Sequence, residues 1–358
     1  MKFTIPLKPF RTAFATAAAA SSGRTPLPIL QNVKFSAKAG TLTLTGSNSE
    51  TSVRVKIEAD VKEDGDALAP TATVTQLLRA FTGDSVSVET DGNAVVFRCG
   101  NAKNRLQSPA PDEFPNPPTA PGYCFTGSGE ALSRALLQVL PAIDTESTRY
   151  ALGGVCFHTE DGRLMCVATD TRRLHLVPVS GQVTSELKPV VVPAVACKAI
   201  ARMTDGDVAI GATASMLFAS QGDIEVATRL VEGVFPKYLS VIPKSEHAIS
   251  VLVGGLAPII ESANVTTSVE STGVDFTITP DQLTVSSEAA EVGGSECSLP
   301  ISGGVDCKLR LNGRFVLETL KMLPDEAEVR IDYTDEDTAV QIHHGESLFL
   351  VMPIGERK

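Results

Sequence analysis

The stretch Gly154–Leu174, GVCFHTEDGRLMCVATDTRRL, predicts a strand, a tight turn and a second strand. Val155 and Phe157 alternate along the first half, a polar break ends in Gly162, and apolar residues resume at Leu164. A single β-hairpin is an ordinary element, so the stretch becomes informative only when it is compared with the rest of the chain.

The same pattern occurs three times. Residues 32–48 read NVKFSAKAGTLTLTGSN, and residues 273–288 read GVDFTITPDQLTVSSE. Each copy has a valine, a phenylalanine two residues later and a leucine that opens the second strand: Val33, Phe35 and Leu42; Val155, Phe157 and Leu164; Val274, Phe276 and Leu283. The valines are 122 and 119 residues apart, from 155 − 33 and 274 − 155. Three copies at this spacing predict three tandem repeats, each long enough to have its own core.

The elements around the hairpins repeat as well. Apolar periodicity predicts two helices in each repeat, at 7–20 and 70–81, at 130–140 and 193–203, and at 256–263 and 312–323. Short alternating strands fill the remainder, and a Pro-rich linker spans 115–121. Two helices against mostly antiparallel strands indicate an α+β fold. We predict three domains, at 1–121, 122–244 and 245–358.

Composition limits the possible functions. The chain of 358 residues has a net charge of −11, which argues against a protein that holds nucleic acid or an anionic membrane over its whole surface. Seven cysteines without a CxxC spacing are typical of reduced, mostly buried thiols in a cytoplasmic protein. No apolar run is long enough to span a membrane.

Catalytic patterns are missing from the sequence. We find no P-loop, no GxSxG, no HExxH and no dinucleotide-binding glycine fingerprint. His175 alternates with two leucines and is interpreted as a solvated strand position, and His343 with His344 as a hairpin end. We therefore predict a protein that is not an enzyme and that has no metal site.

Basic residues recur on the predicted helices. Lys198 and Arg202 are four residues apart and would share a helix face. Such residues are commonly solvated, but in several repeats they could also line one surface that attracts phosphates without reading sequence. The candidate DNA-binding residues are Arg24, Arg79, Arg134, Arg149, Tyr150, Lys198 and Arg202, with Arg314 and Lys321 on the last helix.

Five segments make the sequence resemble a known family. They are GRTPLPILQNV at 23–33, ESTRYALGGV at 146–155, ATDTRRL at 168–174, RLVEGVFPKY at 229–238 and LVMPI at 350–354. In this order, on a threefold repeat, they resemble the bacterial sliding clamps, the β subunits of DNA polymerase III. The resemblance extends over essentially the whole chain.

The resemblance implies three repeats of the DNA-clamp fold in a head-to-tail homodimeric ring, with helices inside and sheets outside. Such a ring encircles double-stranded DNA, independently of its sequence, and tethers the polymerase for processive synthesis. The implied partners are the DNA polymerase III α subunit, the clamp loader, and other polymerases and repair proteins that bind through short linear peptides. Neither a cofactor nor catalysis is implied. A closed ring is compatible with an acidic chain, because topology rather than charge retains the DNA.

The family's peptide pocket and dimer contact correspond to particular positions of this chain. The pocket positions are Leu152, Thr169, Arg173, Leu174, Pro236, Val241, Asn312, Phe315, Val351, Met352, Pro353 and Ile354. The dimer positions are Leu106, Val265 and Thr266. Taken one at a time, the apolar members are equally compatible with core packing.

Departures from the family pattern leave a second hypothesis open. The family usually has a small residue where Thr171 stands, often a basic one at Ser240 and an apolar one at Ser271, and Thr266 is a poor hydrophobe. A diverged paralogue that binds partner peptides as an inhibitor or a resistance variant would also fit. An unrelated enzyme on a triplicated fold is the third reading.

Overall fold

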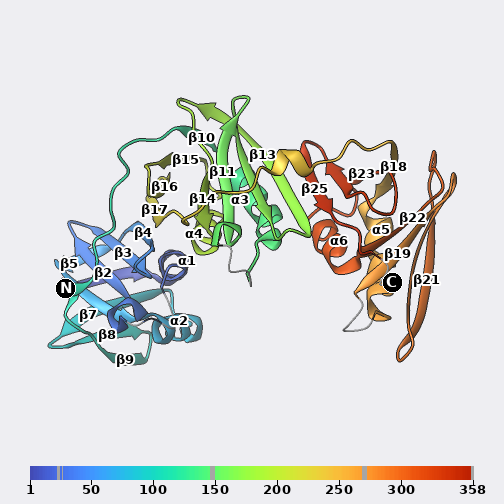
Figure 1. Cartoon of the computed structure of the whole chain (residues 1–358). Coiled ribbons are helices and arrows are strands. Elements are labelled where there is room, and N and C mark those ends of the chain that lie inside the picture. The colour runs from blue at the N-terminus through green and yellow to red at the C-terminus, as the bar shows by residue number, and fades with distance from the viewer. Residues whose placement is uncertain (22–24, 26, 146–149, 268–271, 356–358) are drawn as a thin grey trace.

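The computed structural model describes residues 1–21, 25, 27–145, 150–267 and 272–355. Three units of similar construction follow one another along a curved row (Figure 1). The fold is α+β, and each unit contains two antiparallel sheets and two helices.

The first unit has the sheet β6-β2-β3-β4 and the sheet β5-β1-β7-β8-β9. The strands of the first sheet are β2 (Asn32–Lys38), β3 (Thr41–Ser47), β4 (Thr51–Glu58) and β6 (Gly65–Pro70). Those of the second are β1 (Lys2–Pro6), β5 (Asp60–Glu63), β7 (Ser85–Asp91), β8 (Ala94–Cys99) and β9 (Ala102–Gln107). The repeated hairpin is β2–β3, as its valine–phenylalanine pattern predicts.

The second unit repeats this plan with the strand orders β14-β11-β12-β13 and β10-β15-β16-β17. Its first sheet consists of β11 (Gly154–Glu160), β12 (Arg163–Thr169), β13 (Arg173–Val183) and β14 (Val190–Pro193). Its second consists of β10 (Phe125–Ser128), β15 (Asp207–Ala212), β16 (Met216–Gln221) and β17 (Ile224–Arg229).

The third unit has the strand orders β22-β19-β20-β21 and β18-β23-β24-β25. The strands are β19 (Gly273–Ile278), β20 (Gln282–Ala289), β21 (Gly293–Pro300) and β22 (Cys307–Asn312), and β18 (His247–Leu252), β23 (Glu328–Tyr333), β24 (Val340–His344) and β25 (Ser347–Val351). His343 and His344 end β24 just before the turn into β25, so the predicted hairpin end is confirmed.

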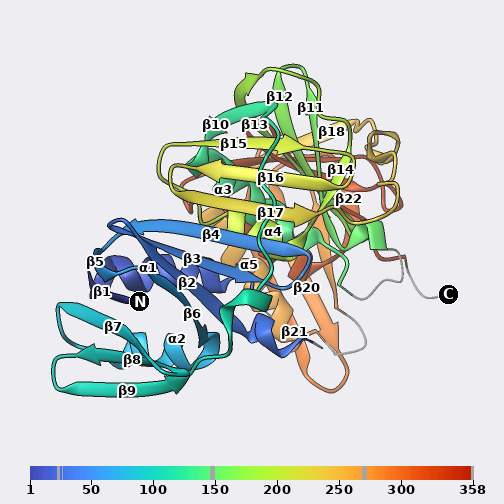
Figure 2. The ribbon, with the colours of Figure 1, turned by 90° about the vertical axis from the view of Figure 1, so that its left-hand side faces the viewer.

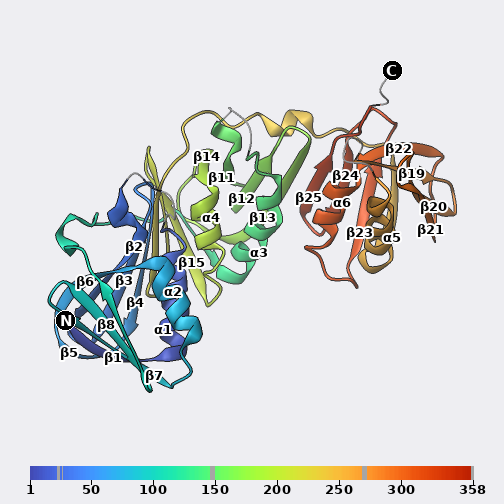
Figure 3. The same cartoon turned by 90° about the horizontal axis from the view of Figure 1, so that it is seen from below.

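The six α-helices of the described residues lie along the hollow side of the row (Figure 3). They are α1 (Leu7–Ala18), α2 (Thr71–Ala80), α3 (Gly129–Val139), α4 (Ala194–Ile200), α5 (Val253–Val265) and α6 (Gly313–Leu320). Apolar residues at helical spacing are buried, as in α1, where Phe10 packs edge-on against Phe14 and Phe35. Short 3₁₀ turns occur at Pro28–Gln31, Pro111–Glu113, Leu140–Ala142, Tyr150–Leu152 and Tyr238–Val241.

Three helices differ from the prediction by three residues at one end, and one of them is α6, which ends at Leu320 rather than at residue 323. α5 begins at Val253, three residues early, because the N–H groups of Val253 and Gly254 donate to the carbonyls of Ala327 and Asp325 instead of requiring a local cap. α4 ends at Ile200, after which tight turns replace the helix. Arg202 therefore lies beyond the helix that was expected to carry it together with Lys198.

Strand pairing crosses both boundaries between units. β17 of the second unit pairs antiparallel with β4 of the first, and β25 of the third pairs with β13 of the second. Figure 2 shows the first of these crossings, where β16, β17, β4 and β3 lie side by side. We call β4–β17 the first junction and β13–β25 the second junction.

Candidate functional site

A cleft of about 390 Å³ lies at the second junction. We call it the anchor cleft; it is lined by Thr169, Thr171, Arg173, Leu174, Pro236, Tyr238, Val241, Pro243, Ala339, Leu350 and Met352. Its walls come from the turn between β12 and β13, the segment after β17, and the end of β25.

Strand register brings these distant segments together. Leu174 lies opposite Leu350, and Arg173 lies opposite Val351. The Met352 N–H then donates to the Arg172 carbonyl at 2.8 Å, which fixes the residue after β25 at the mouth of the cleft. Mostly apolar walls with a few polar groups suit an aliphatic or aromatic side chain of a peptide.

Arg173 holds the base of the cleft. Its side chain is 9% exposed; Nε lies 3.0 Å from Asp170 Oδ2, and Nη1 lies 2.7 Å from Glu318 Oε2 on α6. It also donates to the Pro141 carbonyl, and its guanidinium carbon lies 4.1 Å from the centre of the Phe315 ring. A buried cation with all these partners ties the cleft to both flanking units.

Thr171 has a left-handed backbone, with φ of 75°. A β-branched residue seldom adopts this conformation, whereas glycine does so at no steric cost. The small residue expected at this position would therefore be less strained. The Thr171 N–H donates to Thr169 Oγ1 at 3.1 Å, and this hydrogen bond holds Thr171 at the edge of the anchor cleft.

The structure places six of the twelve expected pocket residues on the cleft wall: Thr169, Arg173, Leu174, Pro236, Val241 and Met352. The other six do not line it. Leu152 and Val351 are buried, Asn312 caps α6 through its side chain, Phe315 lies beside Arg173, and Pro353 and Ile354 follow the wall. Sequence reasoning missed Tyr238, Pro243, Ala339 and Leu350, although two of them fall within the segments 229–238 and 350–354.

The candidate DNA-binding residues fall into two groups. Arg79, Arg134, Lys198 and Arg202 are described and exposed on or next to helices. Arg134 is paired with Glu130 at 2.8 Å, and Arg202 Nη1 donates to the Ala15 carbonyl of α1 at 2.7 Å. Arg24, Arg149 and the side chain of Tyr150 lie outside the described residues. Exposed Lys8 and Arg11 on α1, which the sequence analysis did not select, add positive charge to the same set of helices.

The interpretation of His175 as a solvated strand residue is wrong. The side chain is fully buried, Nδ1 lies 2.6 Å from the Gln138 carbonyl, and the ring packs edge-on against Phe349. Burial lowers the pKa of His175 to about 4. Strand alternation predicted a solvent face, but α3 and α6 cover that face of β13, and the sequence alone did not show this.

Burial lowers the reactivity of several cysteine thiols. Burial raises the pKa of the Cys156 thiol to about 12, and five of the seven cysteines are buried. Among the residues that the structure describes, no group of three or more His, Cys, Asp or Glu side chains is arranged to hold a metal. Within the same residues, no helix is long and apolar enough to cross a membrane.

The expected dimer residues lie at the two ends of the row. Leu106 is half-buried on β9, and Val265 is 72% exposed at the end of α5. Thr266 Oγ1 lies 2.6 Å from Ser287 Oγ, so its hydroxyl is satisfied within its own unit. Both β9 and β21 are sheet edges that lack a partner strand in the described chain.

Comparison with known proteins places this architecture in one family. A sequence profile of the DNA polymerase III beta subunit, N-terminal domain, matches residues 1–118, and one of its central domain matches residues 128–237. The beta sliding clamp of Salmonella typhimurium is 28% identical over 371 residues, covering 99% of this chain and 100% of the relative. That of Micrococcus luteus is 28% identical over 308 residues, covering 84% of this chain and 99% of the relative.

Solved structures share the fold. The DNA polymerase III beta subunit of Thermotoga maritima superposes with a TM-score of 0.91 at 22% identity, covering 99% of this chain and 100% of that one. The sliding clamp of Bartonella birtlesii bound to griselimycin has a TM-score of 0.89 at 24% identity, with 99% of each chain covered. The two profile matches together cover well over half of the sequence and follow the order of its units. This chain therefore belongs to the family of the bacterial DNA polymerase III beta subunits, the beta sliding clamps.

Proposed function

We propose that this protein is a sliding clamp, in which two copies close head to tail around duplex DNA and tether the replicative polymerase without catalysis of their own. The ring would contain three domains from each chain, divided at 1–121, 122–244 and 245–358. Partner proteins, including the polymerase α subunit and the clamp loader, would bind by short peptides whose apolar side chain enters the anchor cleft.

The observation that carries this proposal is the rule of strand pairing at the junctions. At each junction the last strand of one unit pairs with the fourth strand of the preceding sheet: β17 with β4, and β25 with β13. The last strand of the first unit is β9. The fourth strand of the corresponding sheet in the third unit is β21. Pairing β9 with β21 of a second copy uses the same rule a third time, and two such contacts close a ring.

The junctions also predict the register of the missing pair. β9 follows the turn at Gly100 as β17 follows the turn at Gly222, so Ala102 corresponds to Ile224. Val55 lies opposite Leu44, as Cys297 lies opposite Val285, so Cys297 corresponds to Val55. Because Ile224 lies opposite Val55, we expect Ala102 to lie opposite Cys297 of the partner subunit.

Charge supports this register. At the first junction Glu225 lies opposite Arg54, and their side chains form an ion pair at 2.7 Å. The corresponding residues at the open edges are Lys103 and Glu296, which are both exposed. Here the basic residue lies on β9 and the acidic one on β21, the reverse of the first junction. Opposite charges favour the head-to-tail contact, whereas pairing β9 with β9 or β21 with β21 would bring like charges together.

A helix-lined ring needs only weak contacts with DNA. The exposed cations Arg79, Arg134 and Lys198, with Lys8 and Arg11 on α1, would meet phosphates, while α5 has no basic residue. Few phosphate contacts mean a weak, salt-sensitive attraction that leaves sliding free. Retention would then depend on closure of the ring.

One experiment tests closure and encirclement together. In a background with Cys99→Ser, which removes the thiol opposite Ala102 on β8, Ala102→Cys should form a disulfide with Cys297 across the proposed contact, because residues directly opposite have Cβ atoms about 4.5–5.5 Å apart. We expect covalent dimers on non-reducing gels. Protein loaded on a nicked circular plasmid by its clamp loader and then oxidised should stay bound in high salt until the plasmid is cut once.

Matched variants make the outcome decisive. Lys103→Cys places the thiol on the other face of β9 and should not crosslink, and Ala102→Cys with Cys297→Ser should also remain uncrosslinked. Retention of the oxidised protein after linearisation would contradict encirclement. Ladders longer than a dimer would contradict a two-subunit ring.

A further inference from the structure

A second and larger cleft adjoins the anchor cleft. It has a volume of about 700 Å³ and is lined by the outer end of β11, the segment between β13 and β14 and the segment 233–240. We call it the flank cleft. Pro236 and Tyr238 line both clefts, so a single wall separates them. A third hollow of about 550 Å³ continues from the flank cleft past Pro189 and Gly233.

The apolar wall of the flank cleft includes two large side chains that are exposed to solvent. Val234 is 91% exposed and Leu239 is 59% exposed, and both line this cleft. Large apolar side chains at the rim of a hollow are typical of surfaces that another chain covers. They lie on the segment that also forms the wall of the anchor cleft, so an extended peptide could contact both.

The polar side of the flank cleft is acidic. Glu160 and Glu186 are exposed at its lining, and Lys237 is the one lysine or arginine among the lining residues. His158 is 9% exposed, and its Nε2 lies 3.1 Å from Tyr238 Oη and 3.7 Å from Glu160 Oε2. Its Nδ1 is buried without a hydrogen-bond partner among the described residues. This nitrogen is shielded from solvent as well as unpaired, whereas Nε2 makes the contacts with Tyr238 and Glu160.

The protonation of His158 decides which chemistry fits. Burial lowers its pKa, so the ring is neutral at pH 7 and offers one donor and one acceptor. A neutral ring adds no positive charge beside Glu160 and Glu186. Two carboxylates next to an aliphatic wall match a side chain with a long aliphatic stem and a cationic end.

We infer that the partner peptide anchored in the anchor cleft continues over Pro236 and Tyr238 into the flank cleft, where it places a lysine or arginine against Glu160, Glu186 and His158. This inference rests on the proposed function, because it requires the anchor cleft to bind a peptide. It adds a requirement for basic residues beside the apolar anchor. The stem of the basic side chain packs on Leu239, and its charged end meets the carboxylates.

Fluorescence anisotropy with three labelled peptides tests the inference. The first probe is a pentapeptide that carries leucine and phenylalanine; the second and third extend it at both ends by two lysines or by two glutamates. We expect the lysine peptide to bind about tenfold more tightly than the pentapeptide, and the glutamate peptide to show no gain. Equal affinity of the lysine peptide and the pentapeptide would overturn the inference.

Variants locate the gain and separate it from general attraction to an acidic protein. Glu160→Gln with Glu186→Gln should remove the gain from lysine and leave pentapeptide binding unchanged. Glu58→Gln with Glu63→Gln removes two exposed carboxylates from the first unit and should change neither. If this control abolished the gain to the same extent, the flank cleft would not be its source.

Failure of the proposed function has a different signature. Met352→Ala alters the anchor cleft and should weaken the binding of the pentapeptide and of the lysine peptide by the same factor. If the pentapeptide itself did not bind, or bound equally well to Met352→Ala, the anchor cleft would be wrong. If it bound and responded to Met352→Ala while the lysine extension had no effect, only the flank cleft inference would fail.

Discussion

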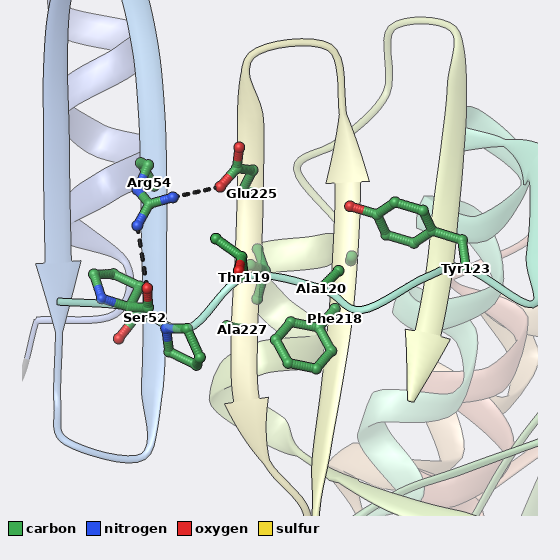
Figure 4. A pocket seen from close by; sticks show the side chains of 12 residues that line it. Ser52, Arg54, Thr119, Ala120, Tyr123, Phe218, Glu225 and Ala227 are labelled. Atoms are coloured by element: carbon green, nitrogen blue, oxygen red, sulfur yellow. Dashed lines mark hydrogen bonds and ion pairs between the residues drawn. The ribbon is translucent and has the colours of Figure 1, made fainter. Parts of the chain in front are cut away.

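The two junctions use the same strand pairing but are stabilised differently. At the first junction the polar groups lie near the surface: Arg54 pairs with Glu225, and its Nη2 also donates to the Pro117 carbonyl of the linker at 3.2 Å. Figure 4 shows Arg54 beside Glu225, with the linker residues Thr119 and Ala120 passing over the strands. The Thr51 and Thr228 hydroxyls form a hydrogen bond of 2.8 Å. Among the described residues it is the one buried hydrogen bond between side chains of β4 and β17.

At the second junction the central polar groups are buried, and an exposed pair, Arg163 with Glu346, lies at its edge. Leu174 and Leu350 pack across the strands, and behind them Arg173 joins the second unit to Glu318 of the third. His175 lies between the Gln138 carbonyl of α3 and Thr319 of α6. A buried network is expensive to break and tolerates few alternative arrangements, whereas surface ion pairs contribute little.

The comparison indicates why the anchor cleft lies at the second junction. In the proposed function this cleft holds a peptide side chain and so needs walls at a fixed separation, which the contacts of Arg173 and His175 support. The hollow at the first junction is smaller, about 140 Å³. The predictions below test this difference, beginning with the largest expected effect.

Arg173→Ala should lower the free energy of unfolding by about 3 kcal/mol, because it leaves the buried Asp170 carboxylate without its cation. Urea unfolding followed by circular dichroism measures this loss. Arg314→Ala is the matched control, since Arg314 pairs with the same Glu318 at 3.2 Å but its side chain is 79% exposed. A loss for Arg314→Ala as large as that for Arg173→Ala would contradict the role of burial.

His175 should make the second junction sensitive to acid. Its pKa is about 4 in the folded protein and about 6.5 in an unfolded chain, so the folded state binds fewer protons between these values. The resulting stabilisation is complete above pH 6.5 and is lost as the pH falls towards 4, by about 3 kcal/mol in total. Unfolding free energies measured across this range should show the decline.

His175→Gln provides the comparison for that profile. The variant is less stable at neutral pH, but its stability should fall much less between pH 6.5 and 4, because the titrating group is gone. A variant profile parallel to that of the wild type would show that other groups cause the acid sensitivity. His158 and His343, whose pKa values are also lowered by burial, are the next residues to replace.

Arg54→Met should cost the least, about 1 kcal/mol or less, because the Arg54 and Glu225 side chains are 21% and 34% exposed. The loss should shrink further in roughly 0.5 M salt, where exposed pairs are screened. Urea unfolding at the two salt concentrations measures both values. A loss above about 2 kcal/mol would mean that the two junctions do not differ in the way described.

Much of the fold could be predicted from the sequence, because the signals were local and repeated. The valine, phenylalanine and leucine positions of the hairpins fixed the strand faces, and apolar spacing located all six helices. The sequence did not show which distant elements cover a given strand face or contact a given helix end. His175 looked exposed because nothing in its own strand shows that α3 and α6 cover it. The start of α5 at Val253 was missed because the carbonyl that its N–H contacts, that of Ala327, is distant in sequence.

The candidate site was predicted only in part, for a related reason. Residues that line the anchor cleft and residues that merely support it occupy the same short segments. Phe315 lies beside Arg173, and Leu350 alternates with buried Val351 along one strand, so position in a segment does not say which side chain reaches the cleft. The flank cleft had no sequence signal, because its polar residues come from separate elements.

The open edges β9 and β21 have a consequence for assembly size. A head-to-tail contact can be repeated indefinitely, and the number of subunits is set by the total rotation from one copy to the next. In the proposed ring that rotation is the sum of the bends at the two junctions within one chain and the bend at the β9–β21 contact. The packing of residues at those junctions would thus help to set the number of subunits. A change of a few degrees in the angle between neighbouring units would turn a closed dimer into an open spiral.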